Sequence, residues 1–220
     1  MIVNKEQLDK IEQYAALLLE WNKKINLISR KDEEKVWQNH ILHSVSLLFR
    51  FRFPKNARIV DIGTGGGLPG IPIKILQPKL EILLIDSRQK KVKALGSILK
   101  ELALSGISVL AGRAEEISRE PRIRHLFDIA VARSVAPLVD LVSWSYPFLR
   151  IGEHRDENRP SDPESNKVTV TAPALLAMKG GDVNAEIRQI GHAAQLQAIE
   201  VIDLNYDRQQ NDKKVVYIKF

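Results

Sequence analysis

The chain has 220 residues, 44% of them hydrophobic and 27% charged, which suits one substantial globular core and is too short for two full-size domains. It contains no cysteine, which excludes disulfides, thiolate metal sites and thiol nucleophiles. The net charge of +6 is compatible with a polyanionic partner, and without a signal pattern or an apolar run of about 18 residues we expect a cytoplasmic protein with no membrane span.

The first fifty or so residues are predicted to be helical. Apolar residues between positions 8 and 19 recur at the spacing of one helix face, and a second helix is predicted over residues 33–51. Two helices cannot bury their apolar faces alone. We therefore expect residues 1–53 to form a helical cap on a domain that spans 54–220, the two making one structural unit.

From residue 58 onward, short apolar runs alternate with amphipathic stretches. This order is typical of βαβ units and predicts a doubly wound α/β fold, with a mostly parallel seven-stranded sheet covered on both faces. The predicted strands are residues 58–62, 81–85, 107–111, 127–132, 174–178, 198–204 and 213–220. The predicted helices are residues 69–77, 88–103, 114–119, 137–148 and 183–194.

Residues 153–173 break this alternation. The stretch 153–166 is crowded with charged residues and contains two prolines. We expect an exposed, inserted loop, with a short extra strand at 167–171.

The first predicted strand runs into a glycine-rich segment, DIGTGGGLPG at 61–70. Glycines allow sharp turns and close approach to a ligand, and the carboxyl edge of a parallel sheet is where α/β folds bind ligands. The spacing of Gly65, Gly67 and Gly70 fits a dinucleotide fingerprint, which would indicate an NAD(P)-dependent oxidoreductase. A tight turn without a ligand would not need so many glycines and prolines.

The second cofactor that fits this segment is S-adenosylmethionine (SAM). Asp61 stands just before Gly63, Gly65 and Gly67, the spacing of the SAM-binding loop. Because SAM carries a cationic amino acid, an acid beside the glycines favours it over a dinucleotide. Asp86 ends the second strand, where an acid would bind a pair of ribose hydroxyls.

Polar residues also follow the later strands. Glu115 follows the third strand, Arg133 the fourth and Lys179 the fifth, which places all three at the expected ligand edge. A solvated helix start or a surface ion pair would explain Glu115 and Arg133 equally simply. The five histidines show no metal-ligand spacing, so we expect no metal.

Several segments together match one family pattern, and they span nearly the whole chain. They are LLLEWNKKIN at 17–26, DIGTGGGLPGIP at 61–72, Asp86-Ser87 with Lys90-Lys91, GRAE at 112–115, Phe127-Asp128, ARSVA at 132–136 and Lys179-Gly180. In this combination the chain resembles the bacterial small-subunit rRNA guanine-N7 methyltransferases, the glucose-inhibited division protein B family. Pro69 and Pro72 after the glycines are more specific to this pattern than the glycines themselves.

This resemblance implies SAM as cofactor, contacted at Gly63, Leu68, Ala114, Glu115 and Arg133. It implies a Rossmann-like methyltransferase sheet with a reversed last strand. The implied product is 7-methylguanosine in a loop of the small-subunit (16S) rRNA. The expected partner is therefore 16S rRNA or the small ribosomal subunit, and we expect a monomer.

The implied chemistry needs little from the protein beyond alignment. Guanine N7 has a free lone pair and no proton to lose, so direct in-line transfer needs no general base. Arg133 and Lys179 are the candidates for positioning the base or its phosphates.

Two features depart from the family pattern. Asn39 stands where a base is usual and His43 where an acid is usual, and residues 153–173 are inserted before the fifth strand. Three alternatives stay open at this point: a methyltransferase of a small molecule, an NAD(P)-dependent oxidoreductase, and a non-catalytic RNA-binding module.

Overall fold

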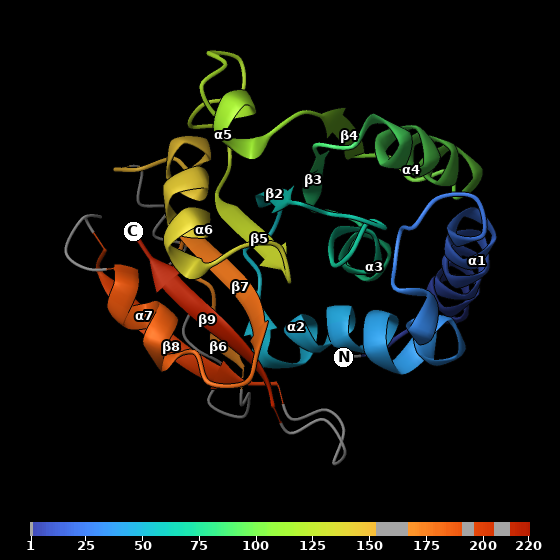
Figure 1. Ribbon diagram of the computed structural model, residues 1–220, viewed down its shortest axis with the longest axis horizontal. Helices are drawn as coiled ribbons and strands as arrows, with labels where there is room; N and C mark the ends of the chain where they lie inside the picture. Colours follow the sequence, from blue (N-terminus) through green and yellow to red (C-terminus); the bar gives the residue numbers. More distant parts are fainter. Residues whose placement is uncertain (1, 153–166, 191–195, 205–211) are drawn as a thin grey trace.

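The computed structural model describes residues 2–152, 167–190, 196–204 and 212–220. The described chain forms a seven-stranded sheet in the order β4-β3-β2-β5-β7-β9-β8, with helices on both faces (Figure 1). Its strands are β2 (Arg58–Ile62), β3 (Glu81–Asp86), β4 (Ile107–Ala111), β5 (Ile129–Arg133), β7 (Ala174–Gly180), β8 (Ala198–Asp203) and β9 (Lys213–Lys219). Strands β4, β3, β2, β5 and β7 are parallel to one another, and β9 runs antiparallel to both β7 and β8. The predicted doubly wound sheet with one reversed strand is confirmed.

The helices divide into two groups, one on each face of the sheet. They are α1 (Lys5–Asn22), α2 (His43–Arg50), α3 (Gly70–Leu76), α4 (Gln89–Glu101), α5 (Ala114–Ile117), α6 (Leu138–Ser145) and α7 (Asn184–Ile190). Residues of α1 to α4 share one buried cluster with Ile59 of β2, and residues of α5 to α7 share the other with Val60. Successive strand residues therefore serve opposite cores, as the pleat requires. No helix in the described ranges is long and apolar enough to span a membrane.

The cap is joined to the sheet domain from its first turn. Asn4 and Gln7 form a capping box at the start of α1, and the Gln7 amide nitrogen also donates to the carbonyls of Ile75 and Leu76 at the end of α3. Along its length α1 contacts α3 and α4 (Figure 1). The division into a cap at 1–53 and a domain at 54–220 stays a prediction, and this packing favours a single unit.

The second predicted helix differs from its prediction. The structure has a 3-10 turn at Arg30–Lys35, a π-helical turn at Trp37–Leu42 and then α2. Apolar spacing predicts which face of the segment is buried, but it cannot predict where the backbone tightens into a 3-10 turn or widens into a π-helical turn. In the structure the segment with these turns also contacts Arg133, which is distant in the sequence. The helix predicted over 137–148 likewise ends early, because α6 gives way to a 3-10 turn at Tyr146–Phe148 around Pro147.

The described end of the inserted stretch is anchored to the end of α2 and the strand that follows it. A short strand, β6 (Val168–Thr169), pairs in parallel with β1 (Phe51–Arg52) at the end of α2, which confirms the extra strand predicted at 167–171. Lys167 donates from Nζ to the carbonyl of Leu48 at 2.7 Å. The predicted exposed loop falls on 153–166, outside the described residues.

Asn22, the last residue of α1, fixes the turn that follows the helix. Its fully buried amide oxygen accepts hydrogen bonds from the backbone nitrogens of Leu27 and Ile28 at 2.8 and 2.9 Å. Its amide nitrogen donates to Glu33 at 2.6 Å. One side chain thus holds both ends of the segment that leads into the 3-10 turn.

We predict that Asn22→Ala destabilises the protein by about 2–4 kcal/mol, because it leaves buried backbone donors without an acceptor. The unfolding free energy from chemical denaturation measures this. Asn26→Ala, a change of the same kind at a neighbouring exposed position, is the control and should cost about 0.5 kcal/mol or less. Equal losses for the two variants would contradict the role given to Asn22.

Candidate cofactor site

The glycine loop is held at the carboxyl edge of the sheet by two carboxylates. Asp86, at the end of β3, accepts from the Gly65 backbone nitrogen at 3.0 Å with one oxygen and from the Arg88 nitrogen at 2.8 Å with the other. The Thr64 nitrogen donates to the carbonyl of Ile85 at 2.9 Å. The end of β3 therefore fixes the loop that leaves β2. The ribose role predicted for Asp86 stays a prediction, and its oxygens keep lone pairs for a further donor.

Asp61 lies fully buried beneath the loop. Its Oδ2 accepts from Thr64 Oγ1 at 2.8 Å and from the Gly70 nitrogen at 2.9 Å. Its Oδ1 is buried with no hydrogen-bond partner among the described residues. Burial raises the pKa of this carboxyl to about 6, although Thr64, Gly70 and Arg133 act to lower it. The free oxygen is an acceptor that would be satisfied by a donor entering the loop.

Glycine is required at two of the predicted loop positions. Gly63 has φ +68°, and a Cβ there would lie 2.5 Å from Val135 Cγ1, in the segment after β5. Gly67 has φ +92°, and a Cβ there would collide with Ile71. These backbone conformations are disfavoured for other residues, so the loop can lie this close to its neighbours only with glycine.

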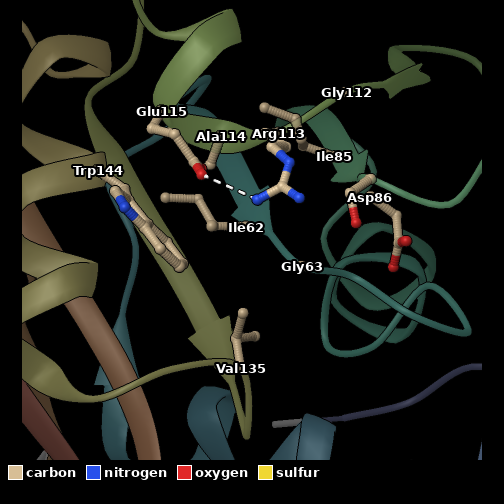
Figure 2. Close-up of a pocket in the computed structure, with 11 residues that line it drawn as sticks. Ile62, Gly63, Ile85, Asp86, Gly112, Arg113, Ala114, Glu115, Val135 and Trp144 are labelled. Carbon is tan, nitrogen blue, oxygen red and sulfur yellow. Dashed lines mark ion pairs between the residues drawn. The ribbon is translucent and has the colours of Figure 1, made fainter.

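A pocket opens beside this loop. It is lined by Gly63, the end of β3 at Ile85–Ser87, and residues 112–115 after β4, with Trp144 of α6 forming another wall (Figure 2). Figure 2 shows Glu115 directed toward Arg113, and their side chains form an ion pair at 3.7 Å. Apolar walls with a few carboxylates at the rim suit a nucleoside. The pocket therefore brings together Gly63, Asp86, Ala114 and Glu115 of the predicted cofactor residues.

The other five predicted cofactor residues are not in the lining of this pocket: Asp61, Gly65 and Gly67 of the loop, Leu68, and Arg133. Leu68 is buried, and its backbone nitrogen donates to the Thr64 carbonyl at 3.0 Å. Arg133, at the end of β5, donates to the carbonyl of Asn39 at 3.2 Å and makes a 3.0 Å hydrogen bond with His40 Nδ1. The Arg133 charge also acts on Asp61, beneath the loop, and on Tyr14 of α1.

Lys179 lies at the same sheet edge, but its ammonium is engaged within the protein. Its Nζ donates to the Ala136 carbonyl and to Glu186, both at 2.7 Å, and Glu186 in turn accepts from the Leu138 nitrogen at 2.8 Å. Lys179 therefore holds the segment between β5 and α6 against α7. Its positioning role toward the base or phosphates stays a prediction.

The site has functional contacts that the sequence did not reveal. Tyr14 of α1 is fully buried and donates from its hydroxyl to the carbonyl of Gly66 at 2.8 Å. Asp32 and His40 approach each other at 3.4 Å beside Arg133. Tyr14 and Trp144 look like core aromatics in the sequence, since nothing nearby marks a contact more than fifty residues away. In the described residues no group of three metal-ligating side chains occurs.

The polar groups of the site fit SAM. The buried Asp61 Oδ1, without a hydrogen-bond partner among the described residues, suits the cationic amino acid end, and the apolar pocket beside Asp86 suits the adenosine. Gly63 joins the two regions, since it belongs to the loop and lines the pocket.

We predict that Gly63→Ala weakens SAM binding by about tenfold or more while the chain still folds, because Val135 and the backbone must move to admit the methyl group. Isothermal calorimetry measures the affinity. Gly96→Ala, on α4, is the matched control, since a Cβ at Gly96 would meet nothing within 4 Å. It should bind SAM normally and gain about 0.5–1 kcal/mol of stability. Normal binding by Gly63→Ala would contradict the close packing of the loop.

His43 generates a pH prediction. It is buried, and burial followed by the charges of Arg133, Lys213 and His40 lowers its pKa to about 3, against a hydrogen bond involving Asn39. This folded-state pKa lies below the unfolded value of about 6.5. The contribution of neutral His43 to the unfolding free energy is therefore fully present above pH 6.5 and is lost as the pH falls from there through the folded pKa.

Between pH 7 and pH 5, the ligand-free protein should therefore lose about 2 kcal/mol more unfolding free energy than His43→Gln does. Chemical denaturation of both proteins at each pH measures this difference. The comparison isolates His43, since Asp61, with its raised pKa, acts in the opposite direction in both proteins. Parallel curves would show that His43 titrates normally.

Comparison with solved structures supports the fold. A SAM-dependent methyltransferase from Aquifex aeolicus is similar with a TM-score of 0.56 at 13% identity, over 86% of this chain and 94% of that chain. A fibrillarin from Aeropyrum pernix, solved with natively bound SAM, is similar with a TM-score of 0.51 at 16% identity, over 74% of this chain and 66% of that chain. These similarities show the methyltransferase fold.

Comparison with known sequences identifies the family. Residues 7–154 match the family model described as rRNA small subunit methyltransferase G. The protein of that name from Moorella thermoacetica is 42% identical over 67% of this chain and 61% of its own length. The one from Caldanaerobacter subterraneus is 36% identical over 89% of this chain and 73% of its length, and the one from Clostridium novyi is 35% identical over 85% and 76%. Family, fold and site agree, and the chain therefore belongs to the rRNA small subunit methyltransferase G family of SAM-dependent methyltransferases.

Proposed function

We propose that the chain transfers the methyl group of SAM to N7 of a guanine in a loop of 16S rRNA, acting as a monomer. The observation that carries the proposal is the glycine loop over Asp61, one of whose buried oxygens has no hydrogen-bond partner among the described residues, beside a pocket with apolar walls in a chain of this family. When bound, SAM supplies an electrophilic methyl group on a positively charged sulfur. The chain's own residues have to bind and orient the two reactants.

The chemistry at N7 suits the residues at this edge. N7 attacks with a lone pair and has no proton to lose, so no side chain has to act as a general base. The groups nearest the loop are accordingly engaged in holding other groups in place. Arg133 holds the cap, and Lys179 holds the segment that carries Val135 over Gly63. We propose that both act by positioning.

The target guanine has to be reached outside a regular helix. In A-form RNA the major groove that contains N7 is too deep and narrow for side chains, so a loop or an extruded base is required. Exposed basic residues lie close to the site at the start of α4, including Arg88, Lys90 and Lys93. Lys91 Nζ is 3.9 Å from where a Cβ of Gly65 would lie. This basic group is our candidate contact for RNA phosphates near the bound cofactor.

The test is transfer of labelled methyl from SAM to small ribosomal subunits, and to naked 16S rRNA, taken from cells that lack this gene. Nucleoside analysis should show 7-methylguanosine at one loop position. No transfer to either RNA, with SAM binding intact by calorimetry, would overturn the rRNA assignment. A small-molecule substrate or a non-catalytic role would then remain.

Two variants separate binding from positioning in this assay. Arg133→Ala should lower both SAM affinity and methylation, each by about tenfold or more, because it removes a charged group between the cap and the loop. Lys179→Ala should lower methylation by a similar factor and leave SAM binding partly intact. Lys100→Ala, at an exposed position at the end of α4, is the control and should behave as the wild type. Normal methylation by both site variants would contradict the roles of Arg133 and Lys179.

A further inference from the structure

A chain of three contacting side chains, Asp32, His40 and Arg133, links the cap to the carboxyl edge of the sheet. The imidazole of His40, in the π-helical turn, makes a 3.0 Å hydrogen bond through Nδ1 with the guanidinium of Arg133. On the other side of the ring, Nε2 lies 3.4 Å from Oδ2 of Asp32. The His40 side chain is 11% exposed and that of Asp32 is 32% exposed, so the inner contact is largely shielded from water. Asp32 Oδ1 also accepts from the Asn39 amide at 2.8 Å.

The chemistry of the three groups determines which nitrogen of the His40 ring carries the proton. A guanidinium can only donate, so His40 Nδ1 has to accept and carries no proton. The ring proton is then on Nε2, facing the Asp32 carboxylate. Burial and the Arg133 charge lower the pKa of His40 to about 4, against the opposing effect of Asp32, which keeps the ring neutral and able to accept.

Arg133 is thereby fixed from one side by the cap. Its Nη1 donates to the Asn39 carbonyl at 3.2 Å, so two adjacent residues of the π-helical turn, Asn39 and His40, hold one guanidinium. Burial raises the pKa of Asp61, which lies beneath the glycine loop, and the Arg133 charge partly opposes this rise. A long, rotatable side chain restrained in this way loses less conformational freedom when a ligand binds beside it.

We propose that His40, oriented by Asp32, is a positioning residue that holds Arg133 ready at the cofactor site. This inference rests on the proposed function in taking SAM as the ligand of the site and Arg133 as one of the residues that contact it. It assigns to the cap a part in binding the cofactor, in addition to covering the core. His40 and Asp32 touch no reacting atom and act through Arg133.

A double-mutant cycle read by SAM calorimetry tests this proposal. His40→Leu and Arg133→Ala should each weaken SAM binding by about tenfold or more, since each removes a hydrogen bond to a charged group. If His40 acts through Arg133, the double variant should bind no more weakly than Arg133→Ala alone. Multiplying losses would overturn the proposal. Normal SAM binding by either single variant would overturn it as well.

Conservative variants separate positioning from loss of packing. His40→Asn can place its amide oxygen near the position of Nδ1, so it should recover most of the affinity that His40→Leu loses. Asp32→Asn should weaken binding less than His40→Leu does. Glu34→Gln, a neighbouring acid on the same 3-10 turn that is exposed, should have no effect. Equal losses for His40→Asn and His40→Leu would contradict the role of the Nδ1 acceptor.

The free protein gives a readout that needs neither RNA nor SAM. At pH 7 the imidazole nitrogen chemical shifts of His40 should show a neutral ring with its proton on Nε2. A doubly protonated ring, or a proton on Nδ1, would overturn the proposal. Because RNA enters none of these measurements, an intact cycle combined with failed rRNA methylation would sink the proposed function and leave this inference standing.

Discussion

The site depends on the burial of one carboxylate under a backbone loop. Asp61 accepts from Thr64 and Gly70, and so holds both ends of the turn between β2 and α3. Asp86 holds the same turn from the neighbouring strand through Gly65. A buried carboxylate is costly unless donors surround it, and here the loop supplies donors to one oxygen only. The other oxygen has no donor among the described residues, so negative charge on the carboxylate is left uncompensated in the ligand-free loop. A cationic ligand would compensate this charge.

The cap completes this arrangement from the opposite side. Tyr14 bonds the carbonyl of Gly66, and a Cβ on Gly66 would clash with Leu18 of the same helix. Asn22 fixes the backbone at Leu27 through a hydrogen bond, and the Leu27 carbonyl oxygen lies 3.5 Å from where a Cβ of Gly66 would be. The glycine loop is therefore enclosed between the sheet and α1, and it cannot be described as a property of the sheet domain alone. Removal of the cap would expose the loop as well as the core.

Sequence predicts the parts of this protein whose signal is local. The strands and the glycine loop follow from apolar alternation and glycine spacing, because each is encoded within about ten neighbouring residues. The reversed direction of β9 is implied by the family resemblance and not by these local patterns. The Asp32–His40–Arg133 chain was not predictable in this way, because Arg133 stands more than ninety positions from His40 and contacts it only in the folded structure. Lys179 shows the opposite case. The sequence placed it at the ligand edge, but its partner Glu186, seven residues later, competes for the ammonium.

The small parallel pair of β1 and β6 has a consequence for how the chain can vary in length. It fixes Val168 and Thr169 to the end of the cap, while Phe127 and Leu149 form an isolated bridge on the other side of the stretch 153–166. Because closure entropy grows only slowly with the length of a connection, these two anchors tolerate connections of different lengths between them. The β1–β6 pair therefore fixes where the chain re-enters the fold, whatever the length of the connection that precedes it.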